Sequence, residues 1–208
     1  MVQLLNSRSN AENRIQRRAE GRRQEILRAA ARVFRRRGFD AAGMREIAEE
    51  ADLSPGNLYH YFKGKQEILY YCQDRALDTM LATLEQAATG ETVSLRLTQV
   101  LTAHVRCILD DMEGAAAHLV VDAFPLELRR PIVAKRDRYE TGVRKLVEEG
   151  EQSGEFSVQE PVIITRAILG ALNWTAQWFD PDGRKNPGEV AEIIAAYLVR
   201  GLRGETRT

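Results

Sequence analysis

Apolar side chains recur every three or four residues along most of the chain, which is the pattern of amphipathic helices. In the first third, this pattern predicts helices at 22–37, 44–50 and 54–62. After residue 65 the helices become longer, and we expect six: 66–88, 92–111, 115–124, 126–150, 161–179 and 187–202. No segment shows the alternation of a strand. The predicted fold class is therefore all-α, with a three-helix head on a six-helix body.

Residues that favour caps and stops mark the helix ends. Gly38 follows the first apolar stripe, at a position where a residue that tolerates positive φ commonly ends a helix. Ser54 is a favourable N-cap, and Pro55 suits the first position of the third helix. In the body, glycines, prolines and a DPDG turn at 180–183 separate the helices.

The chain divides into three predicted parts. Residues 1–20 are polar and carry four arginines, which predicts a basic flexible arm that becomes helical near its end. Residues 21–65 form the head, and residues 66–208 form the body.

Composition indicates a globular protein with an uneven distribution of charge. Apolar residues make up 44% of the 208 residues, and the formal net charge is zero. Residues 1–65 hold fourteen Lys and Arg against eight Asp and Glu, a net charge of +6, so the remainder carries −6. This asymmetry indicates that the basic end binds a polyanion.

No apolar run approaches the ~18 residues of a membrane span, and the N-terminal residues lack the apolar stretch of a signal peptide. We therefore expect a cytoplasmic protein with no membrane partner. Cys72 and Cys107 lie far apart within helical patterns. In that compartment we expect them to be reduced core residues rather than a disulfide.

The segment at 53–65, LSPGNLYHYFKGK, is too polar for a core helix. Together with the preceding helix and a three-residue turn it has the form of a helix-turn-helix, whose second helix enters the DNA major groove. Asn57 and His60 can then hydrogen-bond to bases or phosphates, while Leu58 and Phe62 hold the helix to the head. The alternative is an ordinary amphipathic helix whose tyrosines complete a core.

Other side chains of the same segment suit contacts with the DNA backbone. Tyr59 and Tyr61 can reach phosphate with the hydroxyl and thymine methyl groups with the ring. Gly56 lets the backbone approach closely, and Lys65 suits a phosphate clamp at the start of the next helix.

Three runs of the head form a dense motif: Ile26-Leu27-x-Ala29-Ala30-x-x-x-Phe34-x-x-x-Gly38, Arg45-Glu46-Ile47-Ala48 and Leu58-Tyr59-His60-Tyr61-Phe62-Lys63-x-Lys65. Over roughly residues 22–69 they resemble the N-terminal domain of tetracycline-repressor-type (TetR family) regulators. The resemblance implies a helix-turn-helix DNA-binding domain at 21–65 and a ligand-binding and dimerisation domain at 66–208. It also implies a homodimer that represses transcription from a palindromic double-stranded DNA operator until a small molecule binds.

By the same resemblance, the DNA contacts come from Gly43, Arg45, Ser54, Pro55, Gly56, Asn57, Tyr59, His60, Tyr61 and Lys65. Gly43 departs from the family, which usually has Thr or Ser at this helix start, so a hydroxyl contact is lost. Its backbone N–H can still meet a phosphate. The arginines of the arm either follow the DNA backbone or enter a minor groove, or the arm is a solvated tail.

The last two predicted helices carry apolar stripes that suit a dimer interface. Small residues on the first of them would let helices approach closely, and two helices per subunit would make the four-helix interface that the family implies. The predicted set is Ile164, Ala167, Ile168, Ala171, Val190, Ile193, Ile194, Tyr197 and Leu198. The alternative is that these side chains belong to the core of one subunit.

A ligand cavity would have to lie among the remaining body helices. Its apolar and amphipathic candidates are Leu101, His104, Val105, Leu119, Phe124, Tyr139, Trp174 and Trp178. Each of them could instead be an ordinary core residue. No Glu-x-x-His pair, Cys/His metal spacing, phosphate-cradling Gly loop or nucleophile–base pair stands out, so we expect no cofactor, no metal and no enzyme activity.

The stretch at 129–138 holds five basic residues and one acid within an acidic body. It is either a solvated helix face or the mouth of a site for a polyanionic ligand, because guanidinium groups of Arg129, Arg130 and Arg136 suit phosphate. The segments AILGALNWT at 167–175, Trp178-Phe179 and Pro187-x-Glu189-x-Ala191 are similar to the C-terminal parts of regulators of fatty-acid or sterol catabolism, which sense acyl-CoA thioesters. The effector that this implies is an acyl-CoA.

Three other functions fit the same sequence. A sensor of cationic or aromatic drugs that represses an efflux gene would use Trp174 and Trp178 as its platform. A DNA-architectural protein would bind without any ligand. A helical enzyme fused to a DNA-targeting head would need catalytic groups that the sequence does not display.

Overall fold

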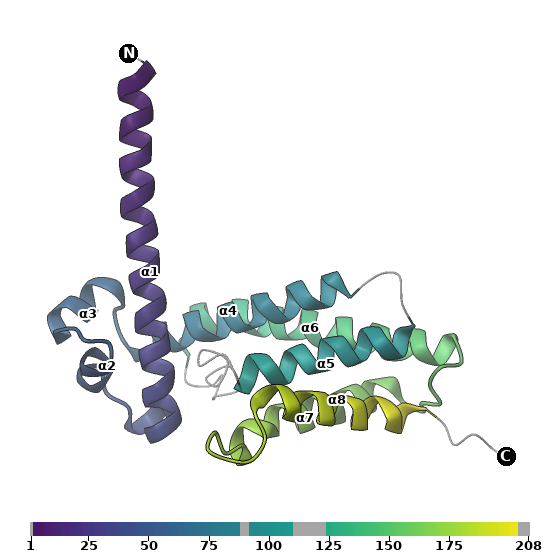
Figure 1. The fold of residues 1–208 in the computed structure, drawn as a ribbon. Helices are drawn as coiled ribbons and strands as arrows, with labels where there is room; N and C mark the ends of the chain where they lie inside the picture. Colours follow the sequence, from purple (N-terminus) through teal and green to yellow (C-terminus); the bar gives the residue numbers. More distant parts are fainter. Residues whose placement is uncertain (1, 88–91, 110–123, 204–208) are drawn as a thin grey trace. The chain divides into compact units, whose positions relative to one another are not determined.

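The computed structural model describes residues 2–87, 92–109 and 124–203, and within these ranges every regular element is a helix (Figure 1). The elements are α1 (Val2–Ala41), α2 (Met44–Glu50), α3 (Pro55–Tyr61), α4 (Lys65–Gln86), α5 (Val93–Leu109), α6 (Leu126–Gln152), α7 (Pro161–Trp178) and α8 (Pro187–Leu202). The predicted all-α class is confirmed. The helix predicted at 115–124 lies, except for its last residue, outside the described residues. None of the described helices is both long and apolar enough to cross a membrane.

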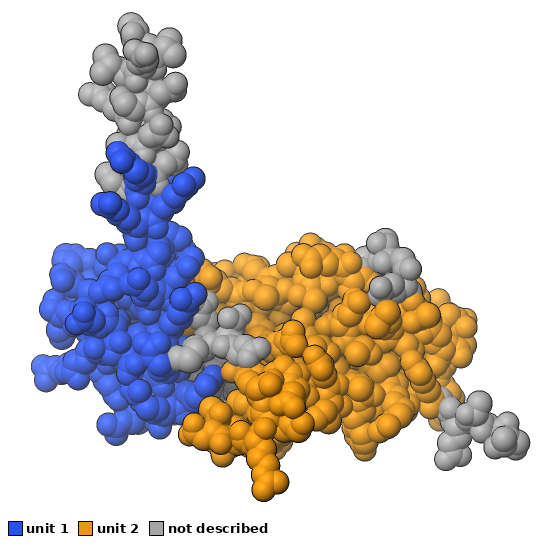
Figure 2. Space-filling model, in the orientation of Figure 1, with its two compact units in different colours: residues 1–69 blue, residues 70–208 orange. Residues whose placement is uncertain are grey.

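The chain forms two compact units, residues 1–69 and 70–208 (Figure 2). The boundary between them falls inside α4. The predicted functional division at residue 65 stays a prediction, since compactness does not say what each part binds.

The core of the first unit is built from α1, α2 and α3. Ile26, Phe34, Ile47 and Leu58 are buried in it, together with Phe62, which caps the C-terminal end of α3. Burying an aliphatic or aromatic side chain of this size stabilises a fold by roughly 1.5–3 kcal/mol. This core holds α2 and α3 against α1.

Gly38 has a φ of 74° and ψ of 161°, which interrupts the helical conformation within α1. The predicted stop at this residue is confirmed. Residues 2–20, predicted to be a flexible arm that becomes helical near its end, form the first turns of α1. Their role as a flexible arm stays a prediction. Neither glycine nor proline occurs before Gly21, and arginine, glutamate, glutamine, leucine and alanine favour the helical state.

In the second unit, α5 packs against α6, α7 and α8. Leu97, Val100 and Leu101 of α5 are buried in a core that all four helices share. The N-terminal end of α5 is capped from a distant loop, where the Glu155 carboxylate accepts hydrogen bonds from the backbone N–H of Val93 (2.8 Å) and Ser94 (2.9 Å). Unpaired N–H groups at a helix start are thereby satisfied.

Candidate functional site

The helix-turn-helix predicted from the sequence is present in the first unit. α2 ends in a turn where Asp52 adopts a φ of 54°, and the backbone N–H of Leu53 donates to the carbonyl of Ala48 at 2.8 Å. Ser54 then caps α3, because its side-chain oxygen accepts from the backbone N–H of Asn57 at 3.2 Å. The turn and cap follow from local sequence, as predicted.

α3 buries Leu58 and presents most of its other side chains to solvent. Pro55, Gly56, Asn57, Tyr59 and His60 are exposed, and Tyr59 leaves 54% of its surface accessible. A polar and aromatic surface of this kind is available for DNA. Tyr61 differs from its neighbours because it is half-buried.

At the start of α2, Gly43 is an exposed N-cap with no side-chain capping bond. Its φ of −114° is ordinary extended backbone, and a Cβ built on it meets nothing within 4 Å. The structure would therefore accept the Thr or Ser that is usual at this position. Arg45, two residues later, is exposed.

Several arginines of α1 form ion pairs and hydrogen bonds within the head. Arg32 and Arg36 pair with Glu50 at 2.5 Å and 2.7 Å, and the hydrogen bonds that Arg36 and Arg32 donate lower the pKa of Glu50. Arg22 donates to the carbonyls of Ala51 and Asp52, both at 3.2 Å. These arginines brace the turn of the motif, a role that counting charges in the sequence did not reveal.

Arg23 supports the recognition helix from behind. Its guanidinium donates to the carbonyl of Tyr61 at 3.3 Å and lies 5.3 Å from the ring centroid of Phe62. A cation is favourable at the C-terminal end of a helix.

Lys65 makes contacts within the head that the sequence did not predict, and its phosphate contact stays a prediction. Its ammonium donates to the carbonyls of Phe39 (2.9 Å), Asp40 (2.8 Å) and Ala42 (3.1 Å). An ammonium has three donors, and three carbonyls engage them. A phosphate could be bound only in exchange for one of these contacts, so the structure gives Lys65 a scaffolding role.

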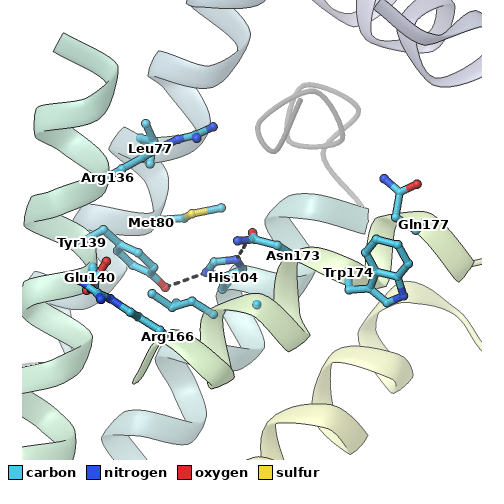
Figure 3. Close-up of a pocket in the computed structure, with 12 residues that line it drawn as sticks. Leu77, Met80, His104, Arg136, Tyr139, Glu140, Arg166, Asn173, Trp174 and Gln177 are labelled. Atoms are coloured by element: carbon cyan, nitrogen blue, oxygen red, sulfur yellow. Dashed lines mark hydrogen bonds and ion pairs between the residues drawn. The ribbon is translucent and has the colours of Figure 1, made fainter. Parts of the chain in front are cut away.

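The second unit contains a cavity of about 500 Å³ between α4, α5, α6 and α7 (Figure 3). This size lies within the range of small-molecule sites. Its lining residues are Leu77, Met80, His104, Arg136, Tyr139, Glu140, Arg166, Leu169, Gly170, Asn173, Trp174 and Gln177. Four predicted ligand residues therefore meet here: His104, Arg136, Tyr139 and Trp174.

The buried end of the cavity, which we call the floor, consists of Leu77, Met80, His104 and Tyr139. His104 is 3% exposed; its Nδ1 lies 3.1 Å from the Tyr139 hydroxyl and its Nε2 3.2 Å from Asn173 Oδ1. Figure 3 shows His104 between these two partners. Burial raises the pKa of Tyr139, so its hydroxyl stays protonated.

The exposed end, the rim, is formed by α7 residues that include Trp174, Arg166 and Gln177. Arg166 pairs with Glu140 at 3.1 Å. Arg136 is half-buried, and it donates to the side-chain oxygen of Gln73 at 3.1 Å. Burial lowers the pKa of Arg136, yet a guanidinium remains charged.

The other predicted ligand residues do not line the cavity. Leu101 and Val105 are fully buried in the core, because they face the neighbouring helices rather than the empty space. Phe124 is buried, with its ring centroid 6.5 Å from that of Tyr70. Leu119 lies outside the described residues, and Trp178 is exposed on α7.

The basic stretch at 129–138 does not form a single mouth. Arg129 and Arg130 are exposed in the first turns of α6 and do not line the cavity. Lys135 pairs with Asp74 (2.5 Å) and Asp78 (2.7 Å) of α4, and Arg138 pairs with Glu85. Most of the predicted mouth therefore packs α6 against α4, and Arg136 alone of the stretch reaches the cavity.

Eight lining residues were not predicted. Those of α7 had a detectable signal, since Arg166, Gly170, Asn173 and Gln177 recur at helical spacing as a polar stripe on an apolar helix. Leu169 lies on the same side. Leu77, Met80 and Glu140 had no such signal, because they look like ordinary core or surface positions in their helices; they complete the lining.

The predicted dimer residues separate into two groups. Ile168 and Val190 are buried, and Ile164, Ile194 and Leu198 pack partly against the same core. The part of these five in a dimer interface stays a prediction. The remaining four are exposed: Ala167, Ala171, Ile193 and Tyr197. Large apolar side chains also exposed on α7 are Ile163, Trp174 and Trp178.

Comparison with known proteins identifies the architecture. The family model described as "Bacterial regulatory proteins, tetR family" matches residues 26–72, and "Tetracyclin repressor-like, C-terminal domain" matches residues 90–202. The chain belongs to the TetR family. It is therefore a DNA-binding transcriptional regulator.

Three proteins illustrate the relationship. The transcriptional repressor KstR2 of Rhodococcus jostii is 27% identical over 88% of this chain and 91% of its own length. The crystal structure of PfmR from Thermus thermophilus is 31% identical, with a TM-score of 0.76 over 86% of this chain and 99% of that one. AibR, crystallised with isovaleryl coenzyme A and operator DNA, is 24% identical, with a TM-score of 0.74 over 88% and 98%.

Proposed function

We propose that this TetR-family protein is a homodimeric repressor whose binding to a palindromic operator is released by an acyl-CoA thioester. The observation that carries the proposal is the cavity, which combines apolar walls with two arginines. Leu77, Met80 and Leu169 suit an acyl chain. Arg136 and Arg166 outnumber the one lining carboxylate, Glu140, so the site favours an anionic ligand.

The relatives support this class of effector. AibR binds isovaleryl coenzyme A together with operator DNA, and KstR2 is a repressor. Both share this fold along nearly their whole length. The ligand of AibR is carried over to this chain only as a proposal.

The DNA contacts are proposed for the exposed residues of the motif. Asn57 and His60 would contact base edges, Tyr59 and Arg45 the phosphates, and α3 would lie in the major groove. The four-helix interface of α7 and α8 would place two such helices on successive half-sites. Its contacts would come from the exposed apolar residues, chiefly Trp178, Ile193 and Tyr197.

Release requires that the thioester bind one conformation of the dimer more tightly than the DNA-competent one. The half-sites would then no longer match the spacing of the recognition helices.

The test is calorimetric titration of the full chain with butyryl-CoA, palmitoyl-CoA, free CoA and the free acids. We expect binding of a thioester and not of its separate halves. Replacing Arg136 with Met keeps the aliphatic stem and removes the charge, and it should weaken thioester binding by about tenfold or more. Arg130→Met is the matched control, because Arg130 does not line the cavity.

Trp174 at the rim favours a second candidate, an aromatic drug. Tight binding of a cationic dye such as ethidium, with no binding of any thioester, would support this drug sensor and contradict the proposal.

A further inference from the structure

The floor of the cavity contains two polar side chains that a plain hydrocarbon chain cannot satisfy. His104 and Tyr139 are 3% and 4% exposed, beside Leu77 and Met80. The cavity opens at the exposed rim. A thioester would therefore enter with its large polar CoA part outside, and the far end of a short acyl group would reach the floor. The polar atoms there would meet that end.

The hydrogen bonds of the floor leave room for one more partner. A tyrosine hydroxyl donates once and accepts up to twice. Within the described residues, Tyr139 has His104 as its hydrogen-bond partner, at 3.1 Å. Tyr139 lines the cavity, and Figure 3 shows its hydroxyl beside His104. The hydroxyl can therefore take part in one further hydrogen bond.

The hydrogen bonds that link Tyr139, His104 and Asn173 can point in either of two directions along the three side chains. If His104 Nε2 carries the hydrogen and donates to Asn173 Oδ1, then Nδ1 accepts from the Tyr139 hydroxyl, whose lone pairs can accept from a ligand. If the hydrogen is on Nδ1 and the Asn173 amide is turned over, the Tyr139 hydroxyl is free to donate. The floor can thus satisfy a ligand hydroxyl or a ligand keto oxygen.

We propose that Tyr139 selects an acyl thioester whose short acyl chain carries a hydroxyl or keto oxygen near its far end, in preference to the plain chain. This inference rests on the proposed function and names its ligand class more closely. A plain chain would exclude water from the Tyr139 hydroxyl and leave His104 as its one hydrogen-bond partner among the described residues. Sites built to hydrogen-bond a ligand group discriminate against analogues that lack it.

The test compares three thioesters of equal length by calorimetric titration of the full chain: butyryl-CoA, 3-hydroxybutyryl-CoA and acetoacetyl-CoA. We expect the two oxygenated thioesters to bind about tenfold more tightly than butyryl-CoA. Tyr139→Phe removes the hydroxyl that distinguishes the three ligands, so it should abolish this preference and bring their affinities together. Tyr70→Phe is the matched control, because Tyr70 is half-buried outside the cavity, and it should keep the preference.

A second variant keeps the test valid if Tyr139→Phe does not fold. Asn173 is exposed on α7, and Asn173→Ala removes the partner of His104 Nε2 without opening the core. As a positioning residue it should lower the preference several-fold, with less effect on butyryl-CoA.

Equal affinity of wild type for all three thioesters would overturn the inference and leave the proposed function standing. A preference that persists in Tyr139→Phe would also overturn it. Failure of every thioester to bind would instead remove the proposed function and the inference with it.

Discussion

The ammonium of Lys65 lies 2.9 Å from the carbonyl oxygen of Phe39 and 4.8 Å from the centroid of its ring. Lys65 is the first residue of α4, and Phe39 directly follows the break at Gly38. The contact ties the start of one helix to the end of another within the first unit. It explains why a lysine that resembles a phosphate contact in the sequence has a structural role.

Lys65→Met should therefore destabilise the protein, because three carbonyls lose a charged donor. We expect a loss of about 1–3 kcal/mol in unfolding free energy, measured by urea titration. Lys63→Met, at an exposed position two residues earlier, should change it by less than about 0.5 kcal/mol. Unchanged stability of Lys65→Met, with a flatter salt dependence of DNA binding, would indicate instead that Lys65 contacts a DNA phosphate.

Gly43→Thr should strengthen operator binding. The position accepts a Cβ, and a hydroxyl there would cap α2 and could reach a phosphate. One added hydrogen bond of about 1 kcal/mol corresponds to roughly fivefold tighter binding, measured by anisotropy at fixed salt. Gly43→Ala adds the Cβ without the hydroxyl and should bind like wild type. Equal affinities of the Thr and Ala variants would mean that a hydroxyl at position 43 does not contact DNA.

The predicted dimer can be tested at the exposed apolar face of α7 and α8. Tyr197 is 66% exposed, and burying a new carboxylate opposite a second copy would be costly. Tyr197→Asp should therefore shift the protein toward monomer in sedimentation velocity, without a large change in helix content. Leu95→Asp, which exposes the same charge on α5, should sediment like wild type. A monomeric wild type would contradict the proposed interface.

Glu155 should make stability depend on pH. Hydrogen bonds from the backbone N–H of Ser94 and Val93 lower the pKa of Glu155. Its stabilising effect is therefore fully present above the ordinary glutamate pKa of about 4.3 and is lost as pH falls through the lower folded value. At pH 7, Glu155→Gln should lose about 1 kcal/mol, as helix caps do.

The Glu155→Gln deficit should shrink in urea titrations below about pH 4, where wild type is protonated as well. Glu151→Gln, at an exposed position of α6, is the control and should show no such trend. A deficit that is constant down to about pH 3 would mean that charge on Glu155 does not matter.

The head could be predicted from the sequence because its signals are local. Ser54 and Pro55 fix the start of α3, and Gly38 fixes the break in α1, through interactions within a few residues. The exposed residues of α3 could be predicted from the helical spacing of its apolar residues, Leu58 and Phe62. The carbonyl contacts of Lys65 could not be predicted, because its partners Phe39, Asp40 and Ala42 come from a helix end more than twenty residues earlier.

The cavity could be predicted only in part, because tertiary packing decides which side of a helix faces empty space. Leu101 and Met80 both occupy apolar positions, but one fills the core and the other lines the cavity. Similarly, Arg130 and Arg136 both belong to one basic stretch, and only their angular positions on α6 separate them. A single sequence shows which positions share a helix face, but not what that face meets.

The central claim is tested most directly by fluorescence anisotropy with DNA from upstream of this protein's own gene, at fixed salt. The account predicts tight binding that butyryl-CoA or its oxygenated analogues release and that free CoA and the free acids do not. Tight binding that no thioester disturbs would contradict the proposed effector. Equal binding to unrelated DNA of the same length would contradict an operator-specific repressor.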